Sequence, residues 1–448
     1  EKAKLLDVRY ISTGTFWRID DMFQLSIELY DSKESEVIWS DTWQESWDDL
    51  PMIKGSLSDG ILKALDTKPK VEQKVETTNA EAYEFYLKAK HKYEKRENTD
   101  DTDITRGLLN KAIEIDANLI LAKMLLGQTY REASDYDKAM GIYTPTLKQV
   151  VEIGDKSGMG ICLHNIGVVY WDKGDFDKAL NYFTRSLEVK EEIEDKRGIG
   201  RTFLHIGNIY AVKRDFDKAL DYLTRSLEIQ KRYDDKEEMG YRLMSIGYVF
   251  WKRGDYDRAL DYHTRSFKIK KDGGDKWGLG YNLENIGEVY FSKGDYDTAL
   301  DYNTHSLKIR EELADPGGLG SIFNNFGLLF FVNNDYKKAE EHLEKSLAIN
   351  KELKRGENDL IEPATYLYLT YRHLTRGYDE GEIHKLIKKT TNIRFEINYR
   401  LYQLLENTSY LETAYSQVQK LADNLEPDVK AKFLSYPIPK AIVEEWEK

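Results

Sequence analysis

Apolar residues along most of the chain recur with the spacing of an α-helix, and the whole pattern repeats every 40 residues. In the unit that begins at Gly280, apolar and small residues from Leu283 to Tyr290 stand at i, i+3, i+4 and i+7, which is one stripe of a helix. A second, mostly apolar stripe runs from Tyr296 to Ile309. Each unit is therefore predicted to hold two helices, and successive units are predicted to stack.

Small residues recur where the two helices of a unit are expected to cross. The repeat glycines are Gly127, Gly167, Gly207, Gly247, Gly287 and Gly327. The repeat alanines are Ala139, Ala179, Ala219, Ala259, Ala299 and Ala339. Because a larger side chain at either place would push the helices apart, both series are predicted to lie at the contact between them.

Aspartate marks the start of each predicted helix. Asp175, Asp215, Asp255, Asp295 and Asp335 precede the second helices, and Asp155, Asp195, Asp235, Asp275 and Asp315 precede the first helices. An aspartate at this place accepts hydrogen bonds from the free N–H groups of the first turn. Gly294 stands just before Asp295, and glycine is the usual residue at a helix end.

These residues resemble the tetratricopeptide repeat family, whose members are stacks of helix–turn–helix units. The matching pattern is leucine, two residues, apolar-Gly, two residues, Tyr, and then Ala twelve residues after the Gly. The 40-residue step is longer than the commoner 34-residue form and is similar to that of kinesin light chain. The resemblance implies an all-α fold, a right-handed α-solenoid, over residues 81–352. One 34-type unit, with the string KAIEIDANLILA from Lys111, would precede six 40-residue units.

The first residues have a different pattern. Residues 9–19, 24–31 and 36–43 are β-branched and aromatic runs separated by polar turns, and residues 50–65 have helical spacing. Three strands and one helix are too few for an independent core. The string from Val8 to Leu50 resembles the later half of the TolB-like domain, which often precedes tetratricopeptide arrays in bacterial signalling proteins. We therefore predict a partial TolB-like α+β domain over 1–68, with its upstream half absent, and a linker over 69–80.

Beyond Lys351 the register decays. Leu367 falls where a repeat glycine is due, and the string RGYDEGE from Arg376 is a shifted form of the GDYD turn. Residues 394–434 keep helical spacing, and Pro437 and Pro439 interrupt it. We predict that residues 353–448 are degenerate helical repeats and a cap for the exposed last face of the array. A second binding site is the alternative.

Charge and composition argue against several classes of function. The chain has 66 Lys+Arg against 79 Asp+Glu, a formal net charge of −13, whereas nucleic acids and anionic membrane surfaces call for a basic face. The single cysteine, Cys162, excludes an internal disulfide and a cysteine-based metal cluster. No apolar run approaches the ~18 residues of a membrane helix. We expect no nucleic-acid partner and no direct membrane insertion. We expect a cytoplasmic location, or an extracytoplasmic one if an upstream segment carries a membrane anchor.

No motif indicates catalysis. Gly278-Leu279-Gly280 precedes a predicted helix, but it follows a helix rather than a strand and lacks the third glycine of a dinucleotide site. Phosphate-binding loops, His-Glu-x-x-His and Gly-x-Ser-x-Gly are absent from the sequence. The eight histidines lack the spacing of metal ligands. We predict no enzyme activity, no cofactor and no metal.

One face of the first helix of each unit is the remaining candidate site. In tetratricopeptide arrays this face lines a concave groove where relatives bind peptides, and we refer to it as the predicted groove. The resemblance places in it Asn165, Val168, Trp171, Asn208, Tyr248, Trp251, Asn285, Glu288, Phe291, Asn325 and Phe331. Asparagine can donate to and accept from a peptide backbone, and aromatic rings supply contact area. The alternative is that the rings are buried against the neighbouring unit.

We therefore predict a non-catalytic scaffold that binds a protein or peptide. Glu284 and Glu288, with few lysines and no basic carboxylate-clamp pattern nearby, favour a neutral or basic ligand segment. The alternative is a regulatory or sensory arm of a larger signalling protein whose upstream domain is a nucleotide cyclase, a Ser/Thr kinase or a DNA-binding regulator. A homo-oligomerisation arm is a third hypothesis.

Overall fold

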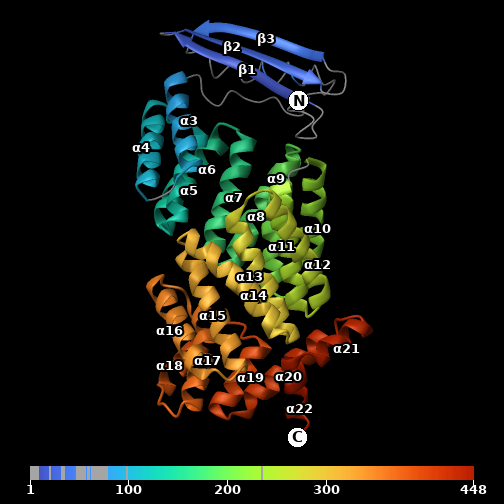
Figure 1. Cartoon of the computed structure of the whole chain (residues 1–448). Coiled ribbons are helices and arrows are strands. Elements are labelled where there is room, and N and C mark those ends of the chain that lie inside the picture. The colour runs from blue at the N-terminus through green and yellow to red at the C-terminus, as the bar shows by residue number, and fades with distance from the viewer. Residues whose placement is uncertain are drawn as a thin grey trace. The chain divides into compact units, whose positions relative to one another are not determined.

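The computed structural model describes residues 10–19, 22–31, 36–46, 57, 61, 79–96, 99–233 and 236–448 (Figure 1). The chain divides into two compact units, residues 1–202 and 203–448. The described residues contain 20 helices and one three-stranded sheet. Those between 120 and 350 contain no strand, as the 40-residue pattern predicts. The predicted α-solenoid fold is confirmed.

The N-terminal sheet consists of β1 (Tyr10–Ile19), β2 (Met22–Asp31) and β3 (Glu36–Ser46). The strands are antiparallel in the order β1-β2-β3, and Leu25 of β2 pairs with Phe16 and Trp43 on its two sides. Phe23 of β2 is buried and stacks on Phe16, with ring centroids 5.7 Å apart. Apart from residues 57 and 61, the helix predicted at 50–65 lies outside the described residues, as does most of the predicted linker. The resemblance to a TolB-like domain stays a prediction.

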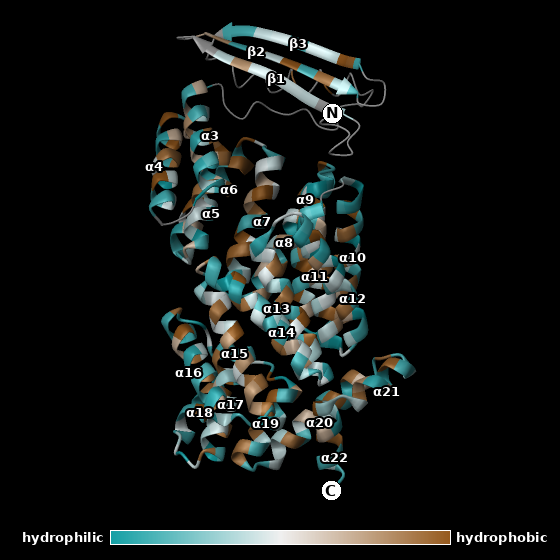
Figure 2. Cartoon of the chain, viewed as in Figure 1, coloured by the Kyte–Doolittle hydropathy of each residue, from teal (hydrophilic) through white to brown (hydrophobic). Residues whose placement is uncertain are grey.

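The helices of the first unit follow one another in pairs. They are α3 (Ala80–Glu94), α4 (Thr99–Ile115), α5 (Ile120–Glu132), α6 (Tyr136–Glu152), α7 (Lys156–Asp172) and α8 (Phe176–Glu192), followed by α9 (Lys196–Val212), in which the unit boundary falls. Brown and teal residues alternate along each helix in Figure 2, as expected of helices that bury one face.

The second unit continues the pairs and ends in shorter helices. Its paired helices are α10 (Phe216–Tyr233), α11 (Lys236–Arg253), α12 (Tyr256–Asp272), α13 (Lys276–Lys293), α14 (Tyr296–Glu312), α15 (Pro316–Val332) and α16 (Tyr336–Glu352). The C-terminal helices are α17 (Glu357–His373), α18 (Glu380–Lys389), α19 (Phe395–Leu405), α20 (Thr408–Ala422), α21 (Pro427–Ser435) and α22 (Pro437–Trp446).

The repeat glycines allow the two helices of each pair to approach closely. A Cβ atom on Gly127 would lie 2.4 Å from the Tyr143 ring, and one on Gly247 would lie 2.8 Å from the ring of His263. Repeat alanines such as Ala259 are fully buried. Both predicted series therefore lie at helix contacts, where one added side chain must displace a neighbour.

The aspartate caps form as predicted where they are described. The Asp155, Asp275 and Asp315 side chains accept hydrogen bonds from backbone N–H groups three residues later, at the starts of α7, α13 and α15. Caps of the same kind start α8, α12, α14 and α16. Asp235 lies outside the described residues. Because these caps satisfy N–H groups that a helix start leaves free, they set where each helix begins.

The last helices fold back onto helices near the middle of the second unit. Phe395, Leu411 and Phe433 belong to one buried hydrophobic cluster with Leu243 of α11 and Val289 of α13. Polar contacts hold the same face: Arg253 Nη2 donates to the carbonyl of Asn424 at 2.9 Å, and Lys432 Nζ lies 2.8 Å from Asp257. This return of the chain, which the sequence pattern does not predict, places C-terminal residues over the first helices of the repeats.

Candidate functional site

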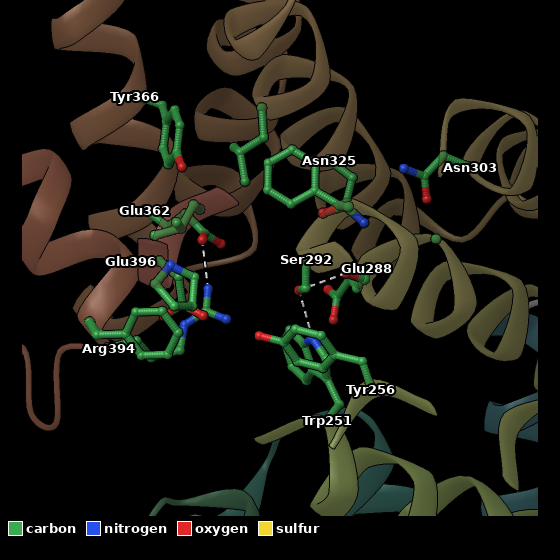
Figure 3. A pocket seen from close by; sticks show the side chains of 16 residues that line it. Trp251, Tyr256, Glu288, Ser292, Asn303, Asn325, Glu362, Tyr366, Arg394 and Glu396 are labelled. Atoms are coloured by element: carbon green, nitrogen blue, oxygen red, sulfur yellow. Dashed lines mark hydrogen bonds and ion pairs between the residues drawn. The ribbon is translucent and has the colours of Figure 1, made fainter. Parts of the chain in front are cut away.

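The second unit contains a small cavity between the repeats and the returning C-terminal helices, which we call the inner pocket. Its volume is about 50 Å³. The repeats contribute Trp251, Tyr256, Gly287, Glu288, Phe291, Ser292, Asn303, Asn325 and Leu328, and the C-terminal helices and the residues next to them contribute Glu362, Tyr366, Arg394, Phe395, Glu396, Ile438 and Pro439. Figure 3 shows Glu288 and Ser292 on one side of it and Glu362 and Arg394 on the other.

Hydrogen bonds hold the Trp251 ring in place. Its indole Nε1 donates to Ser292 Oγ at 2.9 Å, and the Ser292 hydroxyl donates to the backbone carbonyl of Glu288 at the same distance (Figure 3). The ammonium group of Lys252 lies 4.3 Å from the centre of the Trp251 ring, and the Arg394 guanidinium lies 5.6 Å from it. The ring is therefore a fixed face with its polar atom already satisfied within the chain.

One ion pair lies at the inner pocket, and Glu396 Oε2 there has no hydrogen-bond partner among the described residues. Arg394 Nη2 lies 2.6 Å from Glu362 Oε1, and Asn324 Nδ2 donates to Glu362 Oε2 at 3.1 Å. Burial and the positive charge of Arg394 lower the pKa of Lys252 to about 7. Burial also raises the pKa of Glu288, although Lys252 and Arg394 oppose this shift.

Two amides at the inner pocket have unused hydrogen-bonding atoms. Asn325 is 8% exposed, and its Nδ2 has no partner among the described residues. Asn303 is likewise buried, and its Oδ1 is without a partner there. A buried polar atom left without a hydrogen bond costs about 1–3 kcal/mol, so a ligand that supplies the missing partner gains affinity. A group with both an N–H and a C=O, such as a peptide amide, has the chemistry that these two atoms need.

The structure brings together four of the residues of the predicted groove. Trp251, Glu288, Phe291 and Asn325 line the inner pocket. The Tyr248 ring lies 5.8 Å from that of Trp251. The other members of the set lie elsewhere.

Asn208 and Asn285 are half-buried in the second unit and do not line the pocket. Asn165, Val168 and Trp171 belong to the first unit, where Asn165 Nδ2 lies 3.5 Å from Met124 Sδ and the Trp171 ring contacts Phe176. Phe331 is buried and lines a second hollow.

Glu284 is not on the groove surface. It is 7% exposed, and Arg310 Nη2 lies 3.3 Å from its Oε2. Burial raises its pKa to about 8. One of the two acids that favoured a basic ligand is therefore turned toward an arginine inside the helix stack.

Residues of the C-terminal helices complete the pocket, and the sequence reasoning missed them. Glu362, Arg394 and Glu396 come from a region where the 40-residue register has decayed. With no repeat position to assign to them, their sequence offered no signal of their location. Ser292 was missed because serine at this place in one unit has no equivalent in the others.

The second hollow, which we call the outer cleft, is larger, with a volume of about 960 Å³. It is lined by Tyr296, Phe331, Val332, Asn334, Tyr336, Leu369, Arg372, His373, Arg400, Tyr402, Gln403, Glu406 and Thr408. Tyr366 of the inner pocket connects the two, because its hydroxyl oxygen lies 3.2 Å from Arg400 Nε. Both hollows lie within the second unit.

No group of three or more His, Cys, Asp or Glu side chains among the described residues is placed to hold a metal ion. Within the same residues, no helix has both the length and the apolar character needed to cross a bilayer.

A family model of the tetratricopeptide repeat matches residues 119–192, 198–272 and 281–352. The chain therefore contains tetratricopeptide repeats. A comparison with curated proteins finds no match.

Several solved structures are similar to this chain. The Rap protein complexed with competence and sporulation factor is 14% identical, and the match covers 82% of this chain and 99% of that chain with a TM-score of 0.53. This likeness shows the fold alone. The apo form of the quorum sensor NprR from B. thuringiensis is 14% identical over 82% of this chain and 96% of that chain, with a TM-score of 0.48. Repeats of a Podosopora anserina kinesin light chain are 14% identical over 46% of this chain and 96% of that chain, with a TM-score of 0.33.

Proposed function

We propose that this chain of tetratricopeptide repeats is a non-catalytic scaffold that binds a peptide segment across the inner pocket and the outer cleft of its second unit. The observation that carries the proposal is Asn325, a buried amide at the pocket whose Nδ2 has no hydrogen-bond partner among the described residues. The rings of Trp251 and Phe291 line the same pocket. One amide group of the peptide, placed in the pocket, would meet these groups.

The sizes of the two hollows suit different parts of such a ligand. The inner pocket has room for one small group, whereas the outer cleft falls within the range of about 300–1,000 Å³ that is usual for ligand sites. The ion pair of Arg394 with Glu362 satisfies both charges at the inner pocket and favours an uncharged group beside it, whereas the sequence predicts a neutral or basic segment. The Rap protein of similar fold is solved with a bound factor, so this fold accommodates a partner.

A Trp251→Ala variant should lose peptide affinity. The experiment selects peptides from a random phage-displayed library on the immobilised full chain and measures the selected peptides by calorimetry. Loss of a fixed aromatic face at the centre of an interface weakens binding by about 2 kcal/mol or more. Circular dichroism should show unchanged helicity, because the ring is only half-buried.

Asp261→Ala is the control. Asp261 is exposed on α12, where it lies 3.2 Å from Arg265, and it lines neither hollow. Its loss should change affinity little. If the library yields no peptide above an uncoated surface, or if both variants bind equally well, the proposed site is wrong.

A further inference from the structure

Arg400 of α19 lines the outer cleft and makes an incomplete set of contacts. Its Nε lies 3.2 Å from the Tyr366 hydroxyl, and its Nη1 donates to Gln403 Oε1 at 2.7 Å. Among the described residues its Nη2 makes no hydrogen bond, and no carboxylate forms an ion pair with it. Its side chain is half-buried.

Four other arginines of the same unit have a carboxylate partner. Arg242 pairs with Glu238, and Arg310 pairs with Glu284 and Asp315. Arg394 pairs with Glu362, and Arg372 pairs with Glu406. Arg400 differs from these four. Glu406 is the acidic residue in the lining of the outer cleft, and its Oε1 lies 2.8 Å from Nη2 of Arg372.

Aromatic rings surround the Arg400 guanidinium but do not replace a counter-ion. The guanidinium carbon lies 5.4 Å from the ring centres of Phe331 and Tyr366 and 5.7 Å from that of Tyr399. These faces attract the cation weakly, and they also exclude water from around it. A cation held among rings and without a carboxylate binds an incoming anion more strongly than an exposed arginine does, because it has less solvation to lose.

We infer that the outer cleft recognises a carboxylate of an acidic peptide, with Arg400 as the anchor. This inference rests on the proposed peptide-binding function and names the charge that one part of the ligand carries. A planar guanidinium with free N–H groups matches the geometry of a carboxylate.

The rest of the cleft suits a peptide better than a small free anion. Tyr336 and His373 stack with ring centroids 4.2 Å apart and form a flat wall, and Phe331 lines the same hollow. A cleft of about 960 Å³ is far larger than one carboxylate. The carboxylate can come from an Asp or Glu side chain or from the C-terminus of the peptide.

The test compares the peptides that the full chain selects from a displayed random library. Each selected peptide is synthesised in three forms: unchanged, with an amidated C-terminus, and with Glu and Asp replaced by Gln and Asn. We expect that acidic peptides are enriched, and that neutralising the recognised carboxylate weakens binding about tenfold or more. The form that loses affinity identifies the source of the carboxylate.

Variants of the arginine complete the test. Arg400→Gln should bind the unchanged and the neutralised peptides with nearly equal affinity, whereas Arg400→Lys, which keeps the charge, should retain part of the preference. Arg225→Gln is the matched control, because Arg225 is exposed on α10 beside Asp221 and lines neither hollow. Melting temperatures confirm that the variants are folded.

The outcomes separate the two proposals. Peptides that bind without any preference for acids, or an acid preference that survives in Arg400→Gln, would overturn the carboxylate site and leave the peptide-binding function standing. A library that yields no binding peptide would overturn the proposed function, and this inference would fall with it.

Discussion

Replacing His263 by leucine should make the protein more resistant to acid. His263 is 1% exposed, packs against Gly247, and has an Nδ1 with no hydrogen-bond partner among the described residues. Burial lowers its pKa to about 3. The histidine is therefore neutral in the folded protein and gains a proton readily only when the chain unfolds.

The direction of the pH effect follows from that difference. Above pH 6.5, the ordinary pKa of histidine, neither state binds the proton and the folded state keeps its full stability. Below it the unfolded state gains a proton that the folded state does not, so stability is lost by up to about 1.4 kcal/mol per pH unit as the pH falls toward 3. Between pH 7 and pH 5 the loss should amount to about 2 kcal/mol.

Urea unfolding of the parent and of His263→Leu at pH 7 and pH 5 measures this loss. Two other units have a leucine at the repeat position of His263: Leu223 packs on Gly207, and Leu343 packs on Gly327. The variant should therefore fold. The gain over the parent should be larger at pH 5 by about 2 kcal/mol. His305→Leu, on an exposed face of α14, is the control. An equal gain from His263→Leu at both pH values would contradict the prediction.

Gly247→Leu should have the largest destabilising effect. Even a Cβ atom there would lie 2.8–2.9 Å from three atoms of the His263 ring, and a leucine must force α11 and α12 apart. Overpacking of this kind typically costs about 1–3 kcal/mol, and the rigid ring places this position at the upper end. The drop appears as a lower melting temperature and a lower urea midpoint.

Two comparisons test the cause. Gly141→Leu, in the middle of α6 with no atom within 4 Å of its added Cβ, should leave stability unchanged or raise it slightly. In a double-mutant cycle, His263→Ala should relieve part of the cost of Gly247→Ala, because the two side chains compete for one space. Additive effects would show that Gly247 is important for a reason other than this contact.

The repeat architecture could be predicted because its determinants are local and recur many times. Asp275 as a cap, Gly247 at a crossing and Ala259 in the interface each repeat at 40-residue intervals, so one unit predicts the next. The candidate site could be predicted only in part. Trp251 and Phe291 were found from their repeat position, whereas Arg394 and Arg400, in a region without register, were not.

The short-range pattern of the sequence therefore accounts for the helix pairs, their caps and their crossings. It also accounts for the angular position of the rings on the first helices. Helix periodicity and capping depend on residues within a few positions of one another. The return of α19–α22 onto α11, α12 and α13 depends instead on contacts between residues far apart in the chain, such as those of Phe433 with Tyr256 and Lys432 with Asp257 of α12. That packing encloses the inner pocket. Contacts among the C-terminal helices pair Arg394 with Glu362 and give Arg400 no carboxylate partner among the described residues, since the partner of each charge is decided by which distant side chains meet in the folded chain.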